Sequence, residues 1–470
     1  MKRAFLFLLF LCSFLVGCQP QVPVPVITEG GKNPGGRTSR PRFTLTKSQR
    51  VDTSSVSLEE ATAFIQNRYG DMGAFVIEPY NGSTSTIQMY IVNFHQGGWV
   101  ILSADKRTPA ILAESENGVF EIDEANMGLM SWMEETSQRI SVIKNTPDDD
   151  LPFTRDAIQL NKKSWDVKKL PALPQRFIPG DGGHWETDTT YYNEAYETVD
   201  HMTPHWDQNS PYNDCCPLQS NSLTERAPVG CVAVAASGVL YYLHSILGYP
   251  QEMVSSGYCT GDIYNYQKYF SSPSSSVWNS MSYNYQSSSV GMLPEAVLVS
   301  YIGDLVCMNY TNDYSWALPS DIVSAYSTLG IDCLFGTYND GIAKTNLNNG
   351  LPVIVTASNQ LIPVDGRIHC FVIDGYKKTR NVTCVHHYWV PDPHPSPIPI
   401  PEEEDYYTYS YVYLGITKVK INWGWWTQWQ SVPVNDGWYT LTGDWEVTCN
   451  GQTYDYNYNR TMVYGFAIAE

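Results

Sequence analysis

Apolar and polar positions along the chain define two patterned regions. Residues 57–69 carry apolar side chains at helical intervals, behind Ser57 and Glu60 in the spacing of an N-terminal capping box. Short apolar runs then predict strands, and a further apolar stretch predicts a second helix. These elements are strands at 87–94, 97–105, 110–115 and 118–122 and a helix at about 125–145. The pattern therefore predicts a small α+β domain within residues 51–180.

The second region, residues 185–470, has helical periodicity in its first half and strand-like runs in its second half. The expected elements are helices at 231–247, 293–306 and 320–329 and strands at 352–358, 369–377, 417–426 and 437–443. Residues 254–289 are rich in Ser, Tyr and Asn and indicate irregular surface structure, and the Pro-rich, acidic segment 381–415 indicates an exposed extended loop. This order predicts a two-lobed α+β domain with a cleft between the lobes.

The first residues have the pattern of an export signal. Lys2 and Arg3 precede an apolar run that ends just before Cys18, which resembles a bacterial lipoprotein signal. Residues 1–17 would then be removed and the Cys18 thiol would carry the lipid; an ordinary signal peptide is the alternative. Residues 18–50 are rich in Pro and Gly and indicate a tether. We therefore expect an exported protein that its lipid anchors to a bacterial membrane or the cell surface.

The composition limits the classes of function. The chain has 29 Lys+Arg against 48 Asp+Glu, a net charge of −19, which argues against nucleic acid as a partner because phosphate binding needs basic surface. Eleven cysteines lie at scattered spacings without a CxxC pair, which argues against a zinc site. His386, His387 and His394 lie in the Pro-rich segment without a supporting cysteine or carboxylate arrangement. We therefore expect no metal and no other cofactor.

Cys231 stands at the start of the predicted helix 231–247, in the stretch APVGCVAVAASG. The N–H groups and the dipole of a helix N-terminus stabilise a thiolate, which lowers the thiol pKa and gives the nucleophilic form of cysteine. Cysteine is also common in protein cores, and this helix has one buried apolar face. From the helix alone, packing and reactivity are equally well supported.

A nucleophilic thiol needs a base. His244 lies roughly 20 Å along the same helix, at 1.5 Å per residue, and cannot reach the thiol. His369 opens an apolar strand, where an imidazole can face a thiol of the other lobe, although a histidine at a strand end is often structural. Asn422 can hold the second ring nitrogen under the shield of Trp423, unless it is an incidental residue of an aromatic strand. The side-chain amide of Gln208 can donate into an oxyanion hole.

Four segments, in the order Gln, Cys, His and Asn, resemble the streptopain-type cysteine peptidases of the papain-like class. They are DQNSPYN (207–213), GCVAVAASGVLYY (230–242), HCFVIDGY (369–376) and INWGWW (421–426). Residues 97–113 also resemble the inhibitory propeptide of that family. The resemblance implies a papain-like catalytic domain at 185–470, with a helical lobe and an antiparallel β lobe, preceded by an α+β propeptide domain at 51–180.

The resemblance also implies a reaction and a set of roles. Cys231 would be the nucleophile, His369 the general base and acid, and Asn422 the group that orients the imidazole. Gln208 would complete the oxyanion hole, and Trp423 would line the His–Asn pair. The expected activity is endopeptidase cleavage of proteins or peptides through a thioester acyl-enzyme. The propeptide would cover the cleft as an intramolecular inhibitor until it is removed, at a point between residues 145 and 195.

The chain departs from the family pattern beside the histidine. Arg367 and Ile368 stand where the family usually has Gly-Gly, Cys370 where it has Ala, and Trp426–Thr427 where Gly-Gly usually follows. We expect these residues to change substrate choice more than chemistry. Two other functions remain open. One is a catalytically silent, peptidase-like surface lipoprotein that binds peptides or host proteins, and the other is a different Cys-His-Asn acyl-transfer enzyme, of the transglutaminase or amidase kind.

Overall fold

The computed structural model describes most of the chain from residue 54 onward. The described residues are 54–123, 126–151, 154–166, 176–177, 183–248, 257–261, 266–270, 278–283, 293–358, 368–391, 403–425, 435–440, 446–449, 452–455 and 460–469. They belong to one unit that runs from Asp52 to Glu470. The predicted signal, the tether and Cys18 lie outside them, as do Arg367 and His394. Among the described helices, none is both long enough and apolar enough to cross a membrane.

The N-terminal region has the predicted order of helix, strands and helix. α1 (Leu58–Arg68) begins at the predicted capping box, in which the Ser57 side chain accepts from the Glu60 N–H and the Glu60 side chain accepts from the Ser57 N–H. The other elements are η1 (Gly70–Met72), β1 (Phe75–Tyr80), β2 (Met89–Phe94), β3 (Trp99–Ser103), β4 (Ile111–Ser115), α2 (Met127–Asn145), η2 (Asp148–Asp150) and α3 (Arg155–Ser164). The predicted strand at 118–122 is wrong, because the Asn93 side chain bonds both the N–H and the carbonyl of Phe120 in place of a strand partner.

Three of the described helices of the second region share one core. α4 (Cys231–Leu247) has the predicted bounds. The other helices are α6 (Pro294–Leu305), α7 (Asp321–Thr328) and α8 (Asp340–Asn348). Apolar side chains of α4, α6 and α7 pack in a single cluster, here called the helical core, which β13 (Ile368–Pro391) completes with Cys370 and Val372.

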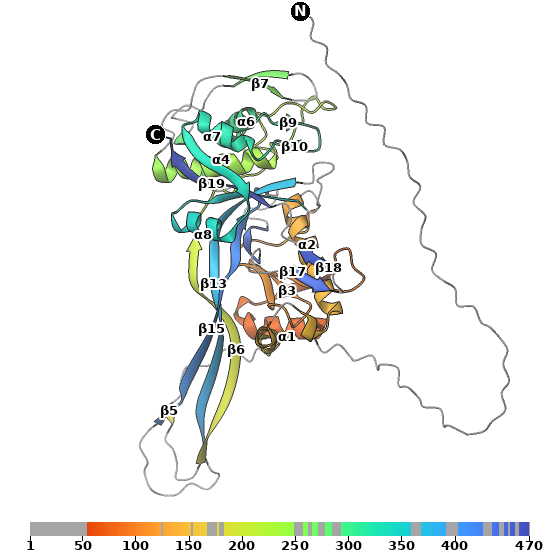
Figure 1. Ribbon diagram of the computed structural model, residues 1–470, viewed down its shortest axis with the longest axis vertical. Coiled ribbons are helices and arrows are strands. Elements are labelled where there is room, and N and C mark those ends of the chain that lie inside the picture. Colours follow the sequence, from red (N-terminus) through yellow and green to blue (C-terminus); the bar gives the residue numbers. More distant parts are fainter. Residues whose placement is uncertain are drawn as a thin grey trace, which may run out of the picture. The chain divides into compact units, whose positions relative to one another are not determined.

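One sheet of eleven described strands joins the two regions (Figure 1). Its order is β1-β2-β3-β4-β16-β15-β13-β12-β19-β11, and β6 also pairs with β13. The strands not yet given are β6 (Gly183–Asp200), β11 (Ile331–Thr337), β12 (Val353–Ser358), β15 (Tyr406–Asn422), β16 (Gly437–Tyr439) and β19 (Thr461–Ile468). Neighbouring strands are antiparallel, and β4 meets β16 where Ala113 faces Tyr439. The predicted antiparallel β lobe therefore continues directly into the N-terminal region.

The described part of the chain also contains short two-stranded sheets, separate from the main sheet. They are β7 (Gly257–Gly261) with β8 (Tyr266–Phe270), β9 (Asn309–Tyr310) with β10 (Ser315–Trp316), β5 (Arg176–Phe177) with β14 (Glu403–Glu404), and β17 (Glu446–Cys449) with β18 (Gln452–Asp455). The β7–β8 pair corrects the expectation of irregular structure at 254–289. Its Tyr, Thr and Phe residues favour strands, which composition read over the whole segment obscured.

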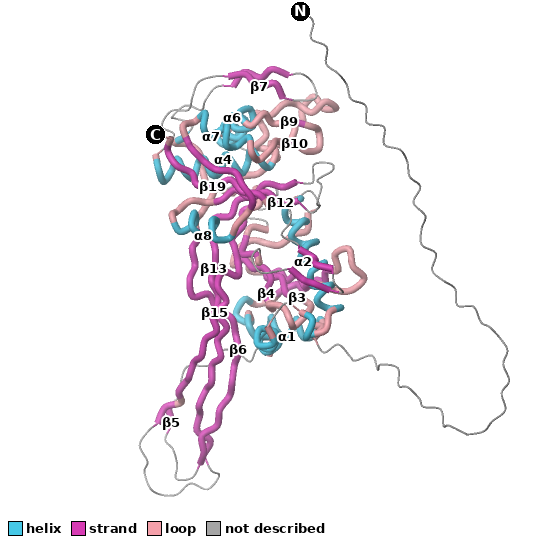
Figure 2. The backbone as a smooth tube through the Cα atoms, in the orientation of Figure 1, coloured by secondary structure: helices cyan, strands magenta, loops and turns pink. Residues whose placement is uncertain are grey.

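Residues 381–391 and 406–415 form strands and not the predicted extended loop. They belong to β13 and β15, which pair as far as His387 and Tyr406, while β6 pairs with the other edge of β13. These three strands form a long ribbon, visible in Figures 1 and 2. Thr, Val and Tyr on either side of the Pro-rich tip favour strands, so the composition of the tip misled the prediction. The tip itself, residues 392–402, lies outside the described part of the chain.

The start of β13 separates two cores. Cys370 and Val372 belong to the helical core with α4, whereas Phe371 and Ile373 pack in a second cluster with side chains of α2. Successive side chains of a strand point to opposite faces of the sheet. His369 therefore shares the face of Phe371 and Ile373, toward the N-terminal region.

Candidate active site

Cys231 is the first residue of α4, as the sequence predicts. The preceding Gly230 has φ +92°, and a Cβ there would lie 2.7 Å from the sulfur of Met308 and 2.9 Å from the carbonyl oxygen of Ser315. Both the backbone conformation and the available space therefore require glycine at this position. The turn places the half-buried Cys231 side chain against the helical core.

The thiol of Cys231 lies beside the start of β13. The backbone N–H of Cys370 donates a hydrogen bond to it, together with N–H groups of the first turn of α4. Burial raises the pKa of the Cys231 thiol, and these donors oppose that shift only in part. The prediction of a lowered pKa is therefore wrong for this structure, because desolvation of the thiolate outweighs the helix N-terminus.

His369 is 3% exposed. Its Nε2 lies 2.9 Å from the carbonyl oxygen of Trp423. A carbonyl oxygen only accepts, so Nε2 carries the proton of the neutral ring and donates it, which leaves Nδ1 unprotonated. Burial lowers the pKa of His369 to about 4, against the opposing effect of the Trp423 carbonyl. The imidazole is therefore neutral at physiological pH, which is the form a general base requires.

The side-chain amide of Asn422 is engaged away from the imidazole. Its nitrogen donates to Oγ1 of Thr203 at 3.1 Å and to the carbonyl of Pro204 at 2.8 Å. Its oxygen accepts the N–H of Gly424 at 3.0 Å. Nε2 of His369 contacts instead the carbonyl of the residue that follows Asn422 in the chain. The orienting role of Asn422 therefore stays a prediction.

Trp423 and Gln208 lie close to these residues. The ring of Trp423 is buried, and its centroid is 6.3 Å from that of His369. Gln208 is buried as well, and its carbonyl accepts the N–H of Val229 at 2.8 Å, which joins its loop to the turn before α4. The elements that carry the five predicted residues therefore meet where α4, β13 and β15 come together.

The sequence did not predict a buried ion pair behind Trp423. Nδ1 of His205 and Oδ2 of Asp436 are 2.6 Å apart. Burial acts to lower the pKa of His205, but the hydrogen bond to Asp436 and its charge raise it overall. The other oxygen of Asp436 accepts the backbone N–H of Trp423 at 2.8 Å. Asp436 thus fixes the backbone of Trp423, whose carbonyl holds His369. Asp436 precedes a Gly at the start of a strand, and nothing in that local sequence indicates its pairing with His205.

The start of α2 covers the candidate base. A Cβ on Gly128 would lie 2.3 Å from Cδ2 of His369 and 2.8 Å from Cζ3 of Trp423. Just before α2, Asp123 accepts a hydrogen bond from Nε1 of Trp425 at 2.7 Å. The Trp425 ring is itself an edge-on neighbour of His369, with centroids 6.5 Å apart. The N-terminal region therefore packs directly on the imidazole.

Of the residues that depart from the family pattern, the structure describes the side chain of Cys370. Cys370 is 1% exposed, and burial, with the added effect of the neighbouring Cys231, raises its pKa well above the usual range. It is therefore a protonated core residue where the family usually has Ala. Arg367, the side chain of Ile368 and Trp426–Thr427 lie outside the described residues. Their expected effect on substrate choice stays a prediction.

His386 and His387, two of the three histidines of segment 381–415, lie on the ribbon. His386 stacks on Tyr407 and His387 stacks on Tyr406, with ring centroids 4.5 Å and 4.3 Å apart. Within the described residues, no group of three or more His, Cys, Asp or Glu side chains is placed to hold a metal ion.

Burial of His369 makes the folded chain sensitive to acid. Its pKa of about 4 lies below the ordinary 6.5, so between these pH values the unfolded chain binds a proton that the folded chain excludes. The free energy of unfolding is therefore highest above pH 6.5 and falls as the pH decreases toward 4. We expect the urea midpoint to decrease more steeply over this window in the wild type than in His369→Gln. Parallel pH profiles of the two proteins would contradict this assignment.

The Cys231 thiol at a helix start lies against the backbone of Cys370, and His369, the preceding residue of that strand, is buried beneath the N-terminal region. The model of the Peptidase C10 family matches residues 206–439, and the model of the Spi protease inhibitor matches residues 48–140. The chain belongs to the peptidase C10 family, the streptopain family, and carries an N-terminal Spi-type inhibitor domain. The predicted resemblance is confirmed, while the predicted boundaries between the regions stay predictions.

Individual relatives agree with this assignment. Streptopain from Streptococcus pyogenes is 26% identical over 175 residues, which are 34% of this chain and 33% of that protein. The matched part thus spans about a third of the length of this curated relative. A fragment of prointerpain A from Prevotella intermedia matches 83% of this chain and 99% of its own, with a TM-score of 0.50 at 19% identity. The fold is therefore the predicted α+β arrangement of a propeptide domain followed by a catalytic domain.

Proposed function

We propose that the chain is the latent precursor of a cysteine endopeptidase that hydrolyses proteins or peptides. Membership of the peptidase C10 family supports cysteine peptidase activity. Cys231 attacks the scissile carbonyl and forms a thioester, with release of the amine half of the substrate. His369 takes the thiol proton and returns it to the leaving amine, then activates the water that hydrolyses the thioester.

The other residues position this reaction. Asn422 orients the imidazole once Nε2 of His369 moves from the Trp423 carbonyl to the neighbouring Asn422 oxygen. Gln208 donates its amide to the developing oxyanion, beside the N–H groups at the start of α4. The support for this arrangement is that the bonds now made by His369 and Asn422 end at adjacent residues, Trp423 and Gly424.

The observation that carries latency is the contact of Gly128 with His369. With α2 in place, the imidazole is buried and its ring is held at Trp423. Departure of the inhibitor domain exposes the imidazole to water, which lowers the desolvation cost of protonating it and lets it take the proton of the Cys231 thiol. A thiolate–imidazolium pair then becomes accessible, so the N-terminal domain acts as an intramolecular inhibitor.

Alkylation of Cys231 tests this proposal. The precursor and the chain freed of its inhibitor domain are treated with iodoacetamide at about pH 6, and modification of each cysteine is followed by mass spectrometry. We expect Cys231 to react slowly in the precursor and much faster in the freed chain, ahead of the other cysteines. A Cys231 that stays unreactive in a freed chain that still binds peptides would favour the silent binding protein. Substrate analysis separates hydrolysis from acyl transfer, because only hydrolysis yields a new carboxylate.

We further propose that the precursor is exported and anchored by a lipid on Cys18, on the basis of the N-terminal signal pattern. In a bacterial host fed radiolabelled palmitate, the chain is expected to take up label and to partition with membranes. Cys18→Ser is expected to lose the label and to leave the membrane fraction, whereas Cys12→Ser, within the signal, should keep both. A wild-type chain that takes up no label would show that the signal is of the ordinary kind, and label retained in Cys18→Ser would show that another residue carries the lipid.

A further inference from the structure

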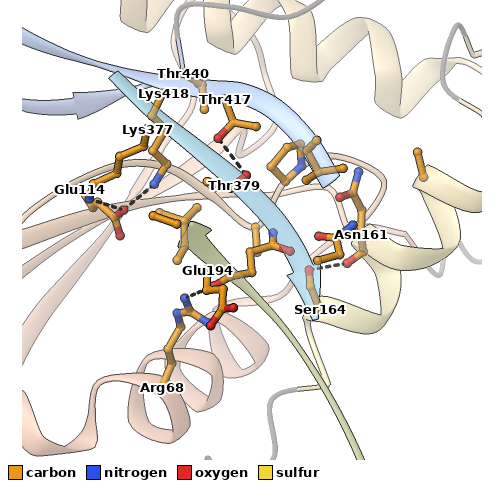
Figure 3. Close-up of a pocket in the computed structure, with 18 of the residues that line it drawn as sticks. Arg68, Glu114, Asn161, Ser164, Glu194, Lys377, Thr379, Thr417, Lys418 and Thr440 are labelled. Carbon is orange, nitrogen blue, oxygen red and sulfur yellow. Dashed lines mark hydrogen bonds and ion pairs between the residues drawn. The ribbon is translucent and has the colours of Figure 1, made fainter. Parts of the chain in front are cut away.

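A cavity of about 460 Å³ lies between the inhibitor domain and the ribbon (Figure 3). Its walls come from α1, β4 and α3 on one side and from β6, β13 and β15 on the other. None of the five candidate active-site residues lines it. Its volume falls in the range of small-molecule sites, about 300–1,000 Å³.

Part of the cavity wall is apolar. Phe64 of α1 and Ile111 of β4 contribute it from the inhibitor domain, and Leu414 of β15 contributes it from the ribbon. Leu414 is 40% exposed, so part of its side chain is free to contact a ligand. This part of the wall can therefore bury an apolar ligand chain, at a gain of about 0.8 kcal/mol per CH₂.

The charged part of the wall concentrates cations on one carboxylate. Nζ of Lys418 and Nζ of Lys377 lie 2.8 Å and 3.6 Å from the same oxygen of Glu114. Although burial acts to raise it, the charges of Lys418, Lys377 and Arg68 hold the pKa of Glu114 at about 2. Burial lowers the pKa of Lys418, and the two neighbouring cations act in the same direction.

The remaining acid of the wall does not balance this charge. Glu194 is paired with Arg380, whose Nε lies 2.7 Å from it. Arg68 donates to the backbone carbonyl of Asn193 at 3.1 Å, which is a neutral acceptor. Figure 3 shows Lys377 and Lys418 beside Glu114, and Arg68 beside Glu194. Three cations thus share a single carboxylate in a partly desolvated place, where an additional anion is favoured.

We propose that this cavity binds an amphipathic organic anion, a carboxylate carried by a medium-length apolar chain. The carboxylate lies beside Lys418, Lys377 and Arg68. The apolar chain lies against Phe64, Ile111 and Leu414. Neither part of the wall alone selects this ligand, since the cations reject a neutral lipid and the apolar wall disfavours a small hydrated anion.

Binding of such a ligand also stabilises the latent form. The ligand contacts the inhibitor domain and the ribbon together, so its site is lost when the two separate. A ligand that binds only the assembled form stabilises it by RT ln(1 + [L]/Kd). The ligand therefore delays release of the inhibitor domain; this second part of the inference rests on the proposed function.

Calorimetric titration of the full chain with decanoate tests the site. The chain carries Cys231→Ala so that it stays intact, and decanol serves as the neutral ligand of equal length. We expect saturable binding of one decanoate per chain and at least tenfold weaker binding of decanol. Lys418→Met should weaken the binding of decanoate at least tenfold. Lys420→Met is the control: Lys420 lies on the same strand as Lys418 but outside the cavity, where it pairs with Asp200 of β6, so this variant should bind decanoate as the parent does.

Leu414→Glu is a second variant, which adds a negative charge to the wall at an exposed position where folding is preserved. Because this charge repels the carboxylate, the variant should also lose binding of decanoate. Three results would overturn the site. They are equal binding of decanoate and decanol, equal binding of decanoate by the parent, Lys418→Met and Leu414→Glu, and no binding of decanoate at all. With Cys231 intact, decanoate should slow precursor conversion with half its effect at the Kd. Binding without slowing would overturn the regulatory part, and a chain that binds decanoate but never converts counts against the proposed peptidase and not against the site.

Discussion

Replacing Cys231 by alanine is expected to abolish peptide hydrolysis and self-conversion of the precursor, a loss on the order of 10⁴-fold or more in kcat. The covalent route needs the sulfur, and no other atom of this side chain can form the acyl-enzyme. Alanine favours helix and the Cys231 side chain is only half-buried, so α4 and the turn at Gly230 should persist. The measurement is hydrolysis of a denatured protein by the purified chain under reducing conditions, together with the size of the chain itself.

Cys307→Ala is the matched control for this loss. Cys307 is also a free cysteine of the catalytic region, but it is exposed and has no part in the proposed site. It should convert and hydrolyse at the wild-type rate. Cleavage that persists in Cys231→Ala, and that a thiol-peptidase inhibitor still blocks, would show that another cysteine is the nucleophile.

The sequence predicts best those elements that bury a long apolar face. α4 has the predicted bounds, and α1 and α2 are found within a few residues of their predictions. β1 and α3 escape the same reading because most of their described positions are half-buried or exposed, so no continuous apolar pattern marks them. Periodicity reports burial of one face, and elements that lack a strongly buried face leave little trace.

The ribbon shows where composition misleads. Pro and acidic residues at its tip dominate the segment 381–415, whereas the strands on either side pair with each other and β13 pairs also with β6, which lies far earlier in the chain. Alternating polar and aromatic residues become strands here because a partner is present. That partner cannot be identified from the segment alone.

In the candidate site, residue types were predictable and their partners were not. A thiol at a helix start and an imidazole at a strand start follow from local sequence. The bond from His369 to the Trp423 carbonyl accompanies coverage by α2, which is a contact between domains. The same holds for Cys231, since the helix N-terminus that lowers a thiol pKa is local, whereas the burial that raises it here is tertiary.

Gly128→Ala is expected to weaken the docking of α2 on the active site and to speed conversion of the precursor. The added Cβ would lie 2.3 Å from His369 and 2.8 Å from Trp423, closer than carbon atoms can approach. Both rings are buried, and His369 is bonded to the Trp423 carbonyl, so α2 must move. Overpacking of this kind costs about 1–3 kcal/mol. Such a cost raises the fraction of chains with α2 displaced by roughly 5–150-fold.

Gly70→Ala separates this effect from a general disturbance of the inhibitor domain. A Cβ at Gly70 meets no atom within 4 Å, so this variant should convert at the wild-type rate. The half-time of conversion and the alkylation rate of Cys231 in the precursor are measured for both variants. Gly128→Ala should be faster in both assays, because the imidazole that it uncovers takes the proton of the Cys231 thiol, and both conversion and alkylation need the thiolate. If it is no faster than Gly70→Ala, the contact of α2 with His369 does not maintain latency, and the hydrogen bond from Trp425 to Asp123 becomes the next contact to remove.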